Sequence, residues 1–343
     1  VPTPINHKKE PDITLLKTAS KTIGKHIKKN DIVVIESTVY PGCTRNDCIP
    51  LIAKISKLRP NKDFFFGYSP ERINPGDKVH TISSIKKVIS ASNESTLKKL
   101  KYIYGSIIKA GIHIAPTIEV AEAAKVIENT QRDLNIAFIN ELSIIFEKME
   151  IPTKSVLEAA STKWNFLNFK PGLVGGHCIG VDPYYLSYAS IKKGYKPRFM
   201  TSGRKINNDM PLYIYNKIIK NLKKYNLTKN TKVLVLGLTF KENVSDIRNS
   251  KIFEIIDQLN KNFKKVEIYD PLIKKDQNDD NYKKNLIDEK KINLKNYQII
   301  IFAVAHDKLI SSFEKKIYSN SSKNKMIVDL TMYLKKEFVD IGY

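Results

Sequence analysis

The sequence predicts an α/β protein in which two doubly wound domains are joined by a long central helix. Short apolar runs alternate with segments of helical periodicity in the first third of the chain and again in the last third. This alternation is typical of βαβ units and parallel sheets. Between them, one helical pattern continues for about thirty residues. With 343 residues, the chain is long enough for two domains that each bury a core.

The first third of the chain opens with a turn that contains Pro2 and Pro4, followed by a periodic stretch over residues 12–29 that predicts a helix. The strands predicted after it are Ile32–Ile35, Phe64–Tyr68, Lys87–Ala91 and Ile112–Ala115. Because neither a strand nor a helix cap precedes the opening turn at Val1, we expect the chain to enter a Rossmann-like domain part-way. The first domain is therefore predicted to be truncated.

The central stretch Glu119–Met149 predicts one long helix. Its apolar residues recur at spacings of three, four and seven, at Val120, Ala124, Ile127, Leu134, Phe138, Leu142, Ile145 and Met149. A helix of this length spans about 45 Å, so we expect it to bridge two domains and to build the interface of a homodimer or larger homo-oligomer. Lys125, Asn129 and Arg132 share one polar face, which their spacing alone would assign to solvent.

The last third of the chain begins near Pro211 and predicts a second doubly wound domain. Its predicted elements are a strand at 232–237, a helix at 250–259 and strands at 266–269, 299–304 and 327–330. The polar stretch 278–296 is predicted to be a surface excursion. The predicted domains are residues 1–117, residues 118–210 and residues 211–343.

The composition is that of an ordinary globular protein, with 42% hydrophobic and 9% aromatic residues. No apolar run approaches the roughly twenty residues of a membrane helix, so no membrane partner is predicted. Three cysteines argue against a disulfide framework and for the cytoplasm, and no metal site is predicted because Cys43 and Cys48 have no second pair. The net charge of +23 is spread over the whole chain without a nucleic-acid module, so no nucleic-acid partner is predicted.

Cys178 is the strongest candidate for chemistry. It lies in the run Gly175-Gly176-His177-Cys178-Ile179-Gly180-Val181-Asp182-Pro183, where glycines allow a ligand to approach the thiol closely. The Asp-Pro pair that follows indicates a helix start, and a cysteine near a helix N-terminus can act as a thiolate nucleophile. The alternatives are a buried, inert cysteine and, for Asp182, a simple N-cap.

Polar side chains follow several predicted strands, at the edge where parallel sheets bind ligands. Thr38 with Pro41-Gly42 follows the first strand, and Glu71-Arg72 with Pro75-Gly76 follows the second. The segment 241–248 follows the first strand of the last domain. Turn residues are expected after strands in any case, and Glu71 with Arg72 could form only a local ion pair.

These runs together resemble the UDP-glucose/GDP-mannose 6-dehydrogenase family over almost the whole chain. The matching runs are Glu36-Ser37-Thr38-Val39-Tyr40-Pro41-Gly42, Ser69-Pro70-Glu71-Arg72-Ile73-Asn74-Pro75-Gly76, Glu122-Ala123-Ala124-Lys125 with Asn129, Gly175 to Pro183, and Gly237-Leu238-Thr239-Phe240-Lys241 with Asp246 and Arg248. His177 and the run Val181-Asp182-Pro183-Tyr184 look like the branch that acts on UDP-N-acetylhexosamines.

The resemblance implies an NAD-dependent enzyme that oxidises the CH2OH group of a UDP-sugar to a carboxylate through a thiohemiacetal and a thioester. It implies that Cys178 is the nucleophile, that Lys125, Asn129 and Asp182 handle protons or oxyanion charge, and that Glu71 and Thr38 serve the hydrolytic water. Thr38, Glu71 and Arg248 would contact the cofactor. Substrate contacts are implied for Glu71, Arg72, Lys125, Asn129, Gly175, Gly176 and Lys241.

One departure from the family pattern concerns the cofactor. The Gly-x-Gly-x-x-Gly turn that places a pyrophosphate on a helix N-terminus does not occur in this sequence. One alternative is therefore a catalytically incomplete fragment that only binds a sugar nucleotide. A second alternative, which does not depend on this departure, is a UDP-glucose or GDP-mannose 6-dehydrogenase. Arg204 with Asn207, Asn208 and Asp209 could touch a nucleotide, but a helix surface is the favoured interpretation.

Overall fold

The computed structural model describes residues 1–74, 76–77, 79–274, 280–322 and 324–343. Pro75 of the second motif and residues 278–279 of the polar stretch lie outside these described residues. The chain forms two compact units, which we call the first and the second unit. The first unit comprises Val1–Arg132 and Val181–Thr201, and the second comprises Asp133–Gly180 and Ser202–Tyr343.

The sheet of the first unit has four strands in the order β1-β2-β3-β4. They are β1 (Ile32–Ile35), β2 (Phe65–Tyr68), β3 (Lys87–Ala91) and β4 (Ile112–Ile114). The pairs β1/β2 and β3/β4 are parallel, whereas β2 and β3 are antiparallel. A parallel neighbour needs a crossover, and the described residues between β2 and β3 contain no helix that could supply it.

The first unit also contains helices that lie wholly within it. They are α1 (Thr14–His26), α2 (Ile49–Ser56), α3 (Glu94–Ile107) and α6 (Asp182–Lys192), with a π-helical turn η1 (Thr44–Cys48) before α2. The side chain of Asn93 accepts a hydrogen bond from the Thr96 N–H and so begins α3 with a regular N-cap. The core of the unit joins Ile52 of α2, Phe66 of β2 and Tyr185 of α6.

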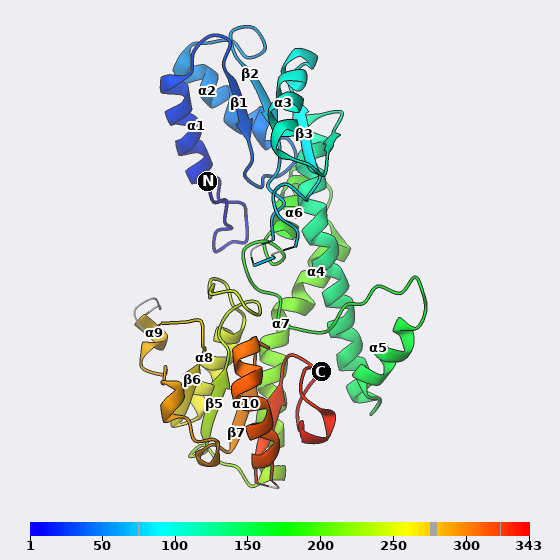
Figure 1. The fold of residues 1–343 in the computed structure, drawn as a ribbon, viewed down its shortest axis with the longest axis vertical. Coiled ribbons are helices and arrows are strands. Elements are labelled where there is room, and N and C mark those ends of the chain that lie inside the picture. Colours follow the sequence, from blue (N-terminus) through cyan, green and yellow to red (C-terminus); the bar gives the residue numbers. More distant parts are fainter. Residues whose placement is uncertain (75, 78, 275–279, 323) are drawn as a thin grey trace. The chain divides into compact units, whose positions relative to one another are not determined.

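Two long helices have residues in both units. The first is α4 (Ile118–Lys148), which confirms the long helix predicted for Glu119–Met149 (Figure 1). The second is α7 (Arg198–Asn221), which contains Pro211, so the predicted domain start falls inside a continuous helix. The division into three domains remains a prediction.

The sheet of the second unit is fully parallel, in the order β6-β5-β7-β8. Its strands are β5 (Lys232–Leu236), β6 (Lys265–Tyr269), β7 (Ile299–Phe302) and β8 (Met326–Asp329). Alternate residues of β5 face opposite sides: Val233 packs with α7 and α8 (Ile252–Asn262), and Leu234 packs with α10 (Asp307–Asn320). Helices thus cover both faces of the sheet, which confirms the doubly wound architecture predicted for this part.

The remaining elements of the second unit are short. They are α5 (Thr153–Ser161), η2 (Leu222–Tyr225), α9 (Asp280–Lys283), η4 (Glu289–Lys291), η5 (Leu294–Asn296) and η6 (Lys336–Phe338). Within the predicted surface excursion, Leu286 and Leu294 are buried in the core, so its described part is anchored to the unit. Across the described ranges, every helix is too short or too polar to span a membrane.

Candidate active site

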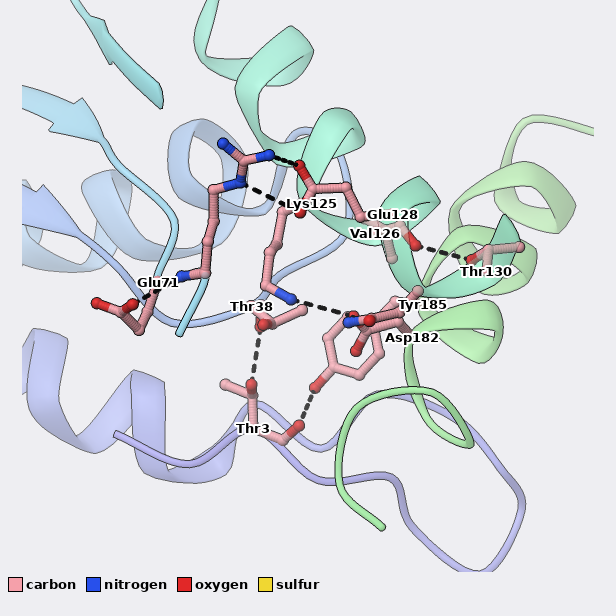
Figure 2. A network of polar contacts seen from close by, with 11 residues as sticks. Thr3, Thr38, Glu71, Lys125, Val126, Glu128, Thr130, Asp182 and Tyr185 are labelled. Carbon is pink, nitrogen blue, oxygen red and sulfur yellow. Dashed lines mark hydrogen bonds and ion pairs between the residues drawn. The ribbon is translucent and has the colours of Figure 1, made fainter. Parts of the chain in front are cut away.

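The first unit brings Lys125, Asn129 and Asp182 together. Lys125 and Asn129 lie one turn apart on α4, and Asp182 is the first residue of α6. The Asp182 carboxylate accepts a hydrogen bond of 2.6 Å from the Asn129 amide and lies 3.4 Å from Lys125 Nζ (Figure 2). The side chains of Lys125 and Asp182 are only 10% and 3% exposed. The expectation of a solvated face is therefore wrong for Lys125.

Asp182 does not cap its own helix. Val181 occupies the N-cap position, and the Asp182 side chain bonds to α4 instead. Burial raises the pKa of Asp182 above its ordinary value, while Lys125 and Asn129 act in the opposite direction. A buried carboxylate with a raised pKa beside a cation is suited to proton transfer.

Thr38 lies in the loop that follows β1 and is connected to α6 through Thr3. The Thr3 hydroxyl donates to the Thr38 carbonyl at 2.8 Å. The Tyr185 hydroxyl of α6 donates to the Thr3 carbonyl at 2.6 Å (Figure 2). Thr3 therefore fixes the loop of Thr38 relative to the helix that begins at Asp182.

Glu122 fixes the same loop from α4, a role that the sequence reasoning missed. Its carboxylate accepts hydrogen bonds from the N–H groups of Gly42 at 2.5 Å and Thr44 at 2.9 Å. Burial raises the pKa of Glu122, although both N–H donors favour its ionised form. Glu122 lies one turn before Lys125, so the loop after β1 and the Lys125 ammonium are positioned by the same stretch of helix. The apolar repeat of Val120, Ala124 and Ile127 does not include position 122, so the sequence carried no signal that Glu122 is buried.

Glu71 and Arg72 do not form the local ion pair considered above. The Glu71 carboxylate accepts hydrogen bonds from the N–H groups of Arg72 and Ile73 at 2.7 and 2.8 Å and lies 3.6 Å from Lys87 Nζ. Arg72 instead pairs with Glu128 of α4 at 2.7 Å.

The second unit contains a cavity of about 230 Å³ at the carboxyl ends of its strands. Its walls are the segments after β5 (239–242), β7 (303–305) and β8 (330–331), together with 170–173, Gly175 and residues 250–252, where α8 begins. In the sheet, β6 and β7 lie on opposite sides of β5, so the strand order reverses at β5. Open α/β sheets bind their ligands at this kind of switch point. Lys241 lines the cavity and supplies a cation suited to phosphate.

The two glycines before Cys178 allow its loop to lie against the cavity. A Cβ on Gly175 would lie 2.4 Å from the Asn249 carbonyl oxygen. Gly176 has a φ of +79°, and a Cβ there would lie 2.7 Å from the Phe240 ring. Two residues later, Cys178 is exposed, so the alternative of a buried, inert cysteine is wrong.

The loop after β5 is held by a buried histidine. His306 Nε2 lies 3.2 Å from an Asp270 carboxylate oxygen and 3.0 Å from the Thr239 hydroxyl. His306 Nδ1 accepts a hydrogen bond from the Asn243 N–H at 2.8 Å. Because Thr239 precedes Lys241 and Asn243 follows it, these contacts fix the chain on both sides of Lys241.

Arg248 lies beyond this loop and forms a bidentate pair with Asp246, at 2.9 and 2.7 Å. Its side chain is 69% exposed. The guanidinium lowers the pKa of Asp246 below its ordinary value. His177 Nε2 lies 3.8 Å from the same carboxylate.

A second buried network fixes the segment that leads to Cys178. The Asn140 amide of α4 donates to the Gly172 carbonyl at 3.0 Å, and its oxygen accepts from the Gly172 N–H at 2.8 Å. Asn140 also donates to Asn207, and Asn207 and Arg204 both donate to the Asp133 carboxylate. Arg204 and Asn207 are 4% and 0% exposed, so their assignment to a helix surface is wrong.

These features define a class of protein. Two α/β units with a ligand cavity at the carboxyl edge of the second sheet define an α/β protein of the nucleotide-binding type. Its exposed thiol on a glycine-rich loop and its buried Lys-Asn-Asp cluster are groups of the kind that enzymes use for covalent and acid–base chemistry.

Comparison with known proteins gives the family. Models of the NAD binding domain, the central domain and the UDP binding domain of the UDP-glucose/GDP-mannose dehydrogenase family match residues 1–108, 119–209 and 234–336. The chain belongs to this family. It is an NAD-dependent nucleotide-sugar dehydrogenase, with NAD as cofactor and a UDP-sugar as substrate.

Relatives are similar over nearly the whole chain. A UDP-N-acetyl-D-glucosamine 6-dehydrogenase of Salmonella typhi is 46% identical over 99% of this chain and 80% of its own length. Protein CapL of Staphylococcus aureus is 50% identical over 96% of this chain and 77% of its own length. The solved structure of a UDP-D-ManNAc dehydrogenase from Pyrococcus horikoshii covers 100% of this chain and 79% of its own, at 26% identity and a TM-score of 0.86.

The match to the NAD binding domain begins at residue 1, so it does not support the expectation that the first domain is truncated. The parallel strands β1 and β2 lead to Thr38 and Glu71 at the edge where parallel sheets bind their ligands. Because the sequence contains no Gly-x-Gly pair, we assign no residue to the pyrophosphate.

Proposed function

We propose that this dehydrogenase oxidises the C6 hydroxymethyl group of a UDP-N-acetylhexosamine to a uronic acid, which serves surface polysaccharide synthesis. The observation that carries the proposal is the exposed Cys178 on a loop whose glycines dock against the cavity of the second unit. The names of relatives such as the UDP-N-acetyl-D-glucosamine 6-dehydrogenase of Salmonella typhi support the sugar class. The three cysteines of this chain are free, which suits a reducing compartment, and we therefore propose that the enzyme works in the cytoplasm.

The proposed chemistry divides a four-electron oxidation into covalent stages. Bound NAD⁺ supplies the hydride acceptor for each of the two oxidations. The Cys178 thiolate adds to the C6 aldehyde as a thiohemiacetal, which is oxidised to a thioester. Water then attacks the thioester carbonyl, the C–S bond breaks, and the thiolate is regenerated with the carboxylate product. A thiol is required because its sulfur is both a good nucleophile and a good leaving group.

The Lys-Asn-Asp cluster is proposed to manage protons and oxyanion charge. Lys125 and Asn129 are donors, and the Asp182 carboxylate between them accepts from both. Donors aimed at a developing oxyanion stabilise it by a few kcal/mol.

Glu71 and Thr38 are proposed to serve the hydrolytic water and the cofactor. Lys241 is proposed to bind the substrate phosphates, together with the Gly175-Gly176 backbone, and Arg72 to contact the substrate. Arg248 is proposed to contact the cofactor.

A substrate panel tests the sugar assignment. Purified enzyme with NAD⁺ is offered UDP-GlcNAc, UDP-GalNAc, UDP-ManNAc, UDP-glucose and GDP-mannose, and NADH and acid are counted for each. We expect two NADH per acid with a UDP-N-acetylhexosamine. A higher kcat/KM for UDP-glucose or GDP-mannose would select that alternative. Binding of a UDP-sugar without NADH formation would identify a chain that only binds sugar nucleotides.

Substitution of the thiol tests the covalent route. Cys178→Ser should abolish acid formation while UDP-sugar binding, measured by calorimetry, stays within about threefold of wild type. Cys43→Ala, which removes a buried thiol of the first unit, is the matched control and should retain the stoichiometry of two NADH per acid. Undiminished acid formation by Cys178→Ser would refute the thioester route.

A further inference from the structure

Lys87 is a buried cation that the reaction described above does not use. It is the first residue of β3, and its side chain is only 7% exposed. Its ammonium lies 3.5 Å from Glu36 and 3.6 Å from Glu71, and 5.4 Å from the centre of the Tyr104 ring. A buried lysine is retained only when anions or acceptors compensate its desolvation, and here two carboxylates do so.

The contacts of Glu71 show what this cation fixes. One carboxylate oxygen accepts the N–H groups of Arg72 and Ile73, and the other faces Lys87. The Arg72 guanidinium is bonded in turn to the Lys86 carbonyl at 2.7 Å and to Glu128. Both oxygens are therefore oriented, while the side chain stays 47% exposed and accessible to water.

Glu36 is held in place independently of Glu71. The Tyr104 hydroxyl of α3 donates to a Glu36 oxygen at 2.6 Å, which is the oxygen that faces Lys87. Lys87 thus has one fixed anion on the side of β1 and one on the side of β2. Without the charge of Lys87, the carboxylates of Glu36 and Glu71 would lose the cation that lies between them. The Glu71 oxygen that faces Lys87 would then no longer be held in place.

We propose that Lys87 is a positioning residue for thioester hydrolysis, acting through Glu71. This inference rests on the proposed function. In the step concerned, the water oxygen bonds to the thioester carbonyl carbon, the C–S bond breaks, and the sulfur leaves as the Cys178 thiolate. One proton of the water passes to the Glu71 carboxylate, whose direction Lys87 holds. No electrons are exchanged, so both hydride transfers precede the step that depends on Lys87.

The test separates the oxidations from hydrolysis. Lys87→Met, Lys87→Arg and Lys86→Met are compared with wild type by rapid mixing with saturating NAD⁺ and UDP-sugar, and quenched samples are analysed by intact and peptide mass spectrometry. The Lys86 side chain is exposed beside Lys87, and its substitution leaves its backbone carbonyl in place, so Lys86→Met is the matched control. UDP-sugar binding and thermal unfolding report whether each variant is folded.

We expect Lys87→Met to keep its NADH burst while steady-state turnover falls about 100-fold, with acyl-Cys178 accumulating. Lys87→Arg should restore turnover to within about fivefold of wild type, and Lys86→Met should match wild type. Equal loss of burst and turnover in a folded Lys87→Met, or no acyl-Cys178 in it, would overturn the role of Lys87. If wild type and Glu71→Gln also form no acyl-Cys178, and Cys178→Ser still makes acid, the proposed function itself fails.

Discussion

At the scale of single residues, the environment of Asp182 decides its protonation. The residue is 2% exposed, and its contacts with Lys125 and Asn129 only partly offset the loss of solvation. Burial therefore raises the pKa of Asp182. The unprotonated carboxylate is the form that accepts a proton, so its working form is lost as pH falls through this raised pKa.

Asp182→Asn should lower kcat by about 100-fold or more, because the amide cannot accept a proton. In wild type, activity should fall on the acidic side at a pH above the ordinary Asp pKa of about 3.9. The measurement is kcat against pH for wild type, Asp182→Asn and the surface control Asp209→Asn, whose carboxylate pairs with Lys205 on exposed helix. An acidic limb that survives unchanged in Asp182→Asn would belong to another group.

At the scale of elements, polar residues inside helices connect the loops. Asn140 of α4 satisfies both backbone groups of Gly172, and Asn207 of α7 bonds to Asn140 in turn. The segment that runs from Gly172 to Cys178 thus begins at a position fixed by two helices. When the side chain that bonds such buried backbone groups is removed, the folded state loses free energy, because water cannot easily replace that side chain.

Asn140→Ala should lower the free energy of unfolding by about 2–4 kcal/mol, because it removes the partners of Gly172 and Asn207 together. Denaturant unfolding measures the change. Asn221→Ala on α7 is the control, because the Asn221 amide bonds only to a carbonyl of its own helix, at 2.9 Å, among the contacts described. A loss below about 1 kcal/mol in Asn140→Ala would show that water substitutes for the amide.

Among the elements, sequence periodicity located the strands and the long helix within a few residues but not the direction of β3. Direction depends on whether a helix returns the chain, and the loop before β3 gave no clear signal.

The burial of polar side chains could not be predicted from the sequence either. Lys86 and Lys87 are equivalent in the sequence, and only the register of β3 buries the second. Asp133 and Asn140 are buried on α4, but the apolar repeat of that helix includes neither position, so the sequence did not indicate their burial.

At the scale of the whole molecule, α4 carries apolar residues that its own chain leaves uncovered. Phe138 and Ile145 of α4 and Met149, the residue just after its end, are 53%, 43% and 59% exposed and recur at spacings of seven and four. Large exposed apolar side chains in one row along a helix are typical of an interface. This row supports the homodimer proposed from the sequence.

Phe138→Glu with Ile145→Glu should convert a dimer into a monomer, because two charges would have to be buried in each copy of the interface. Light scattering coupled to gel filtration measures the mass. The control is a double substitution at two exposed lysines of α10, Lys308→Glu with Lys315→Glu, which should leave the mass unchanged. A wild-type monomer across the micromolar range would rule out the interface.

The cavity at the carboxyl edge of β5, β7 and β8 is lined only by residues of the second unit, whereas the NAD-domain match lies within the first. In the proposed reaction, two oxidations in succession require spent coenzyme to depart and a fresh molecule to arrive while the half-processed sugar is retained. Binding of the coenzyme by the first unit and of the sugar nucleotide by the second would allow the coenzyme to exchange without release of the sugar. The reactive aldehyde would then stay bound between the two oxidations.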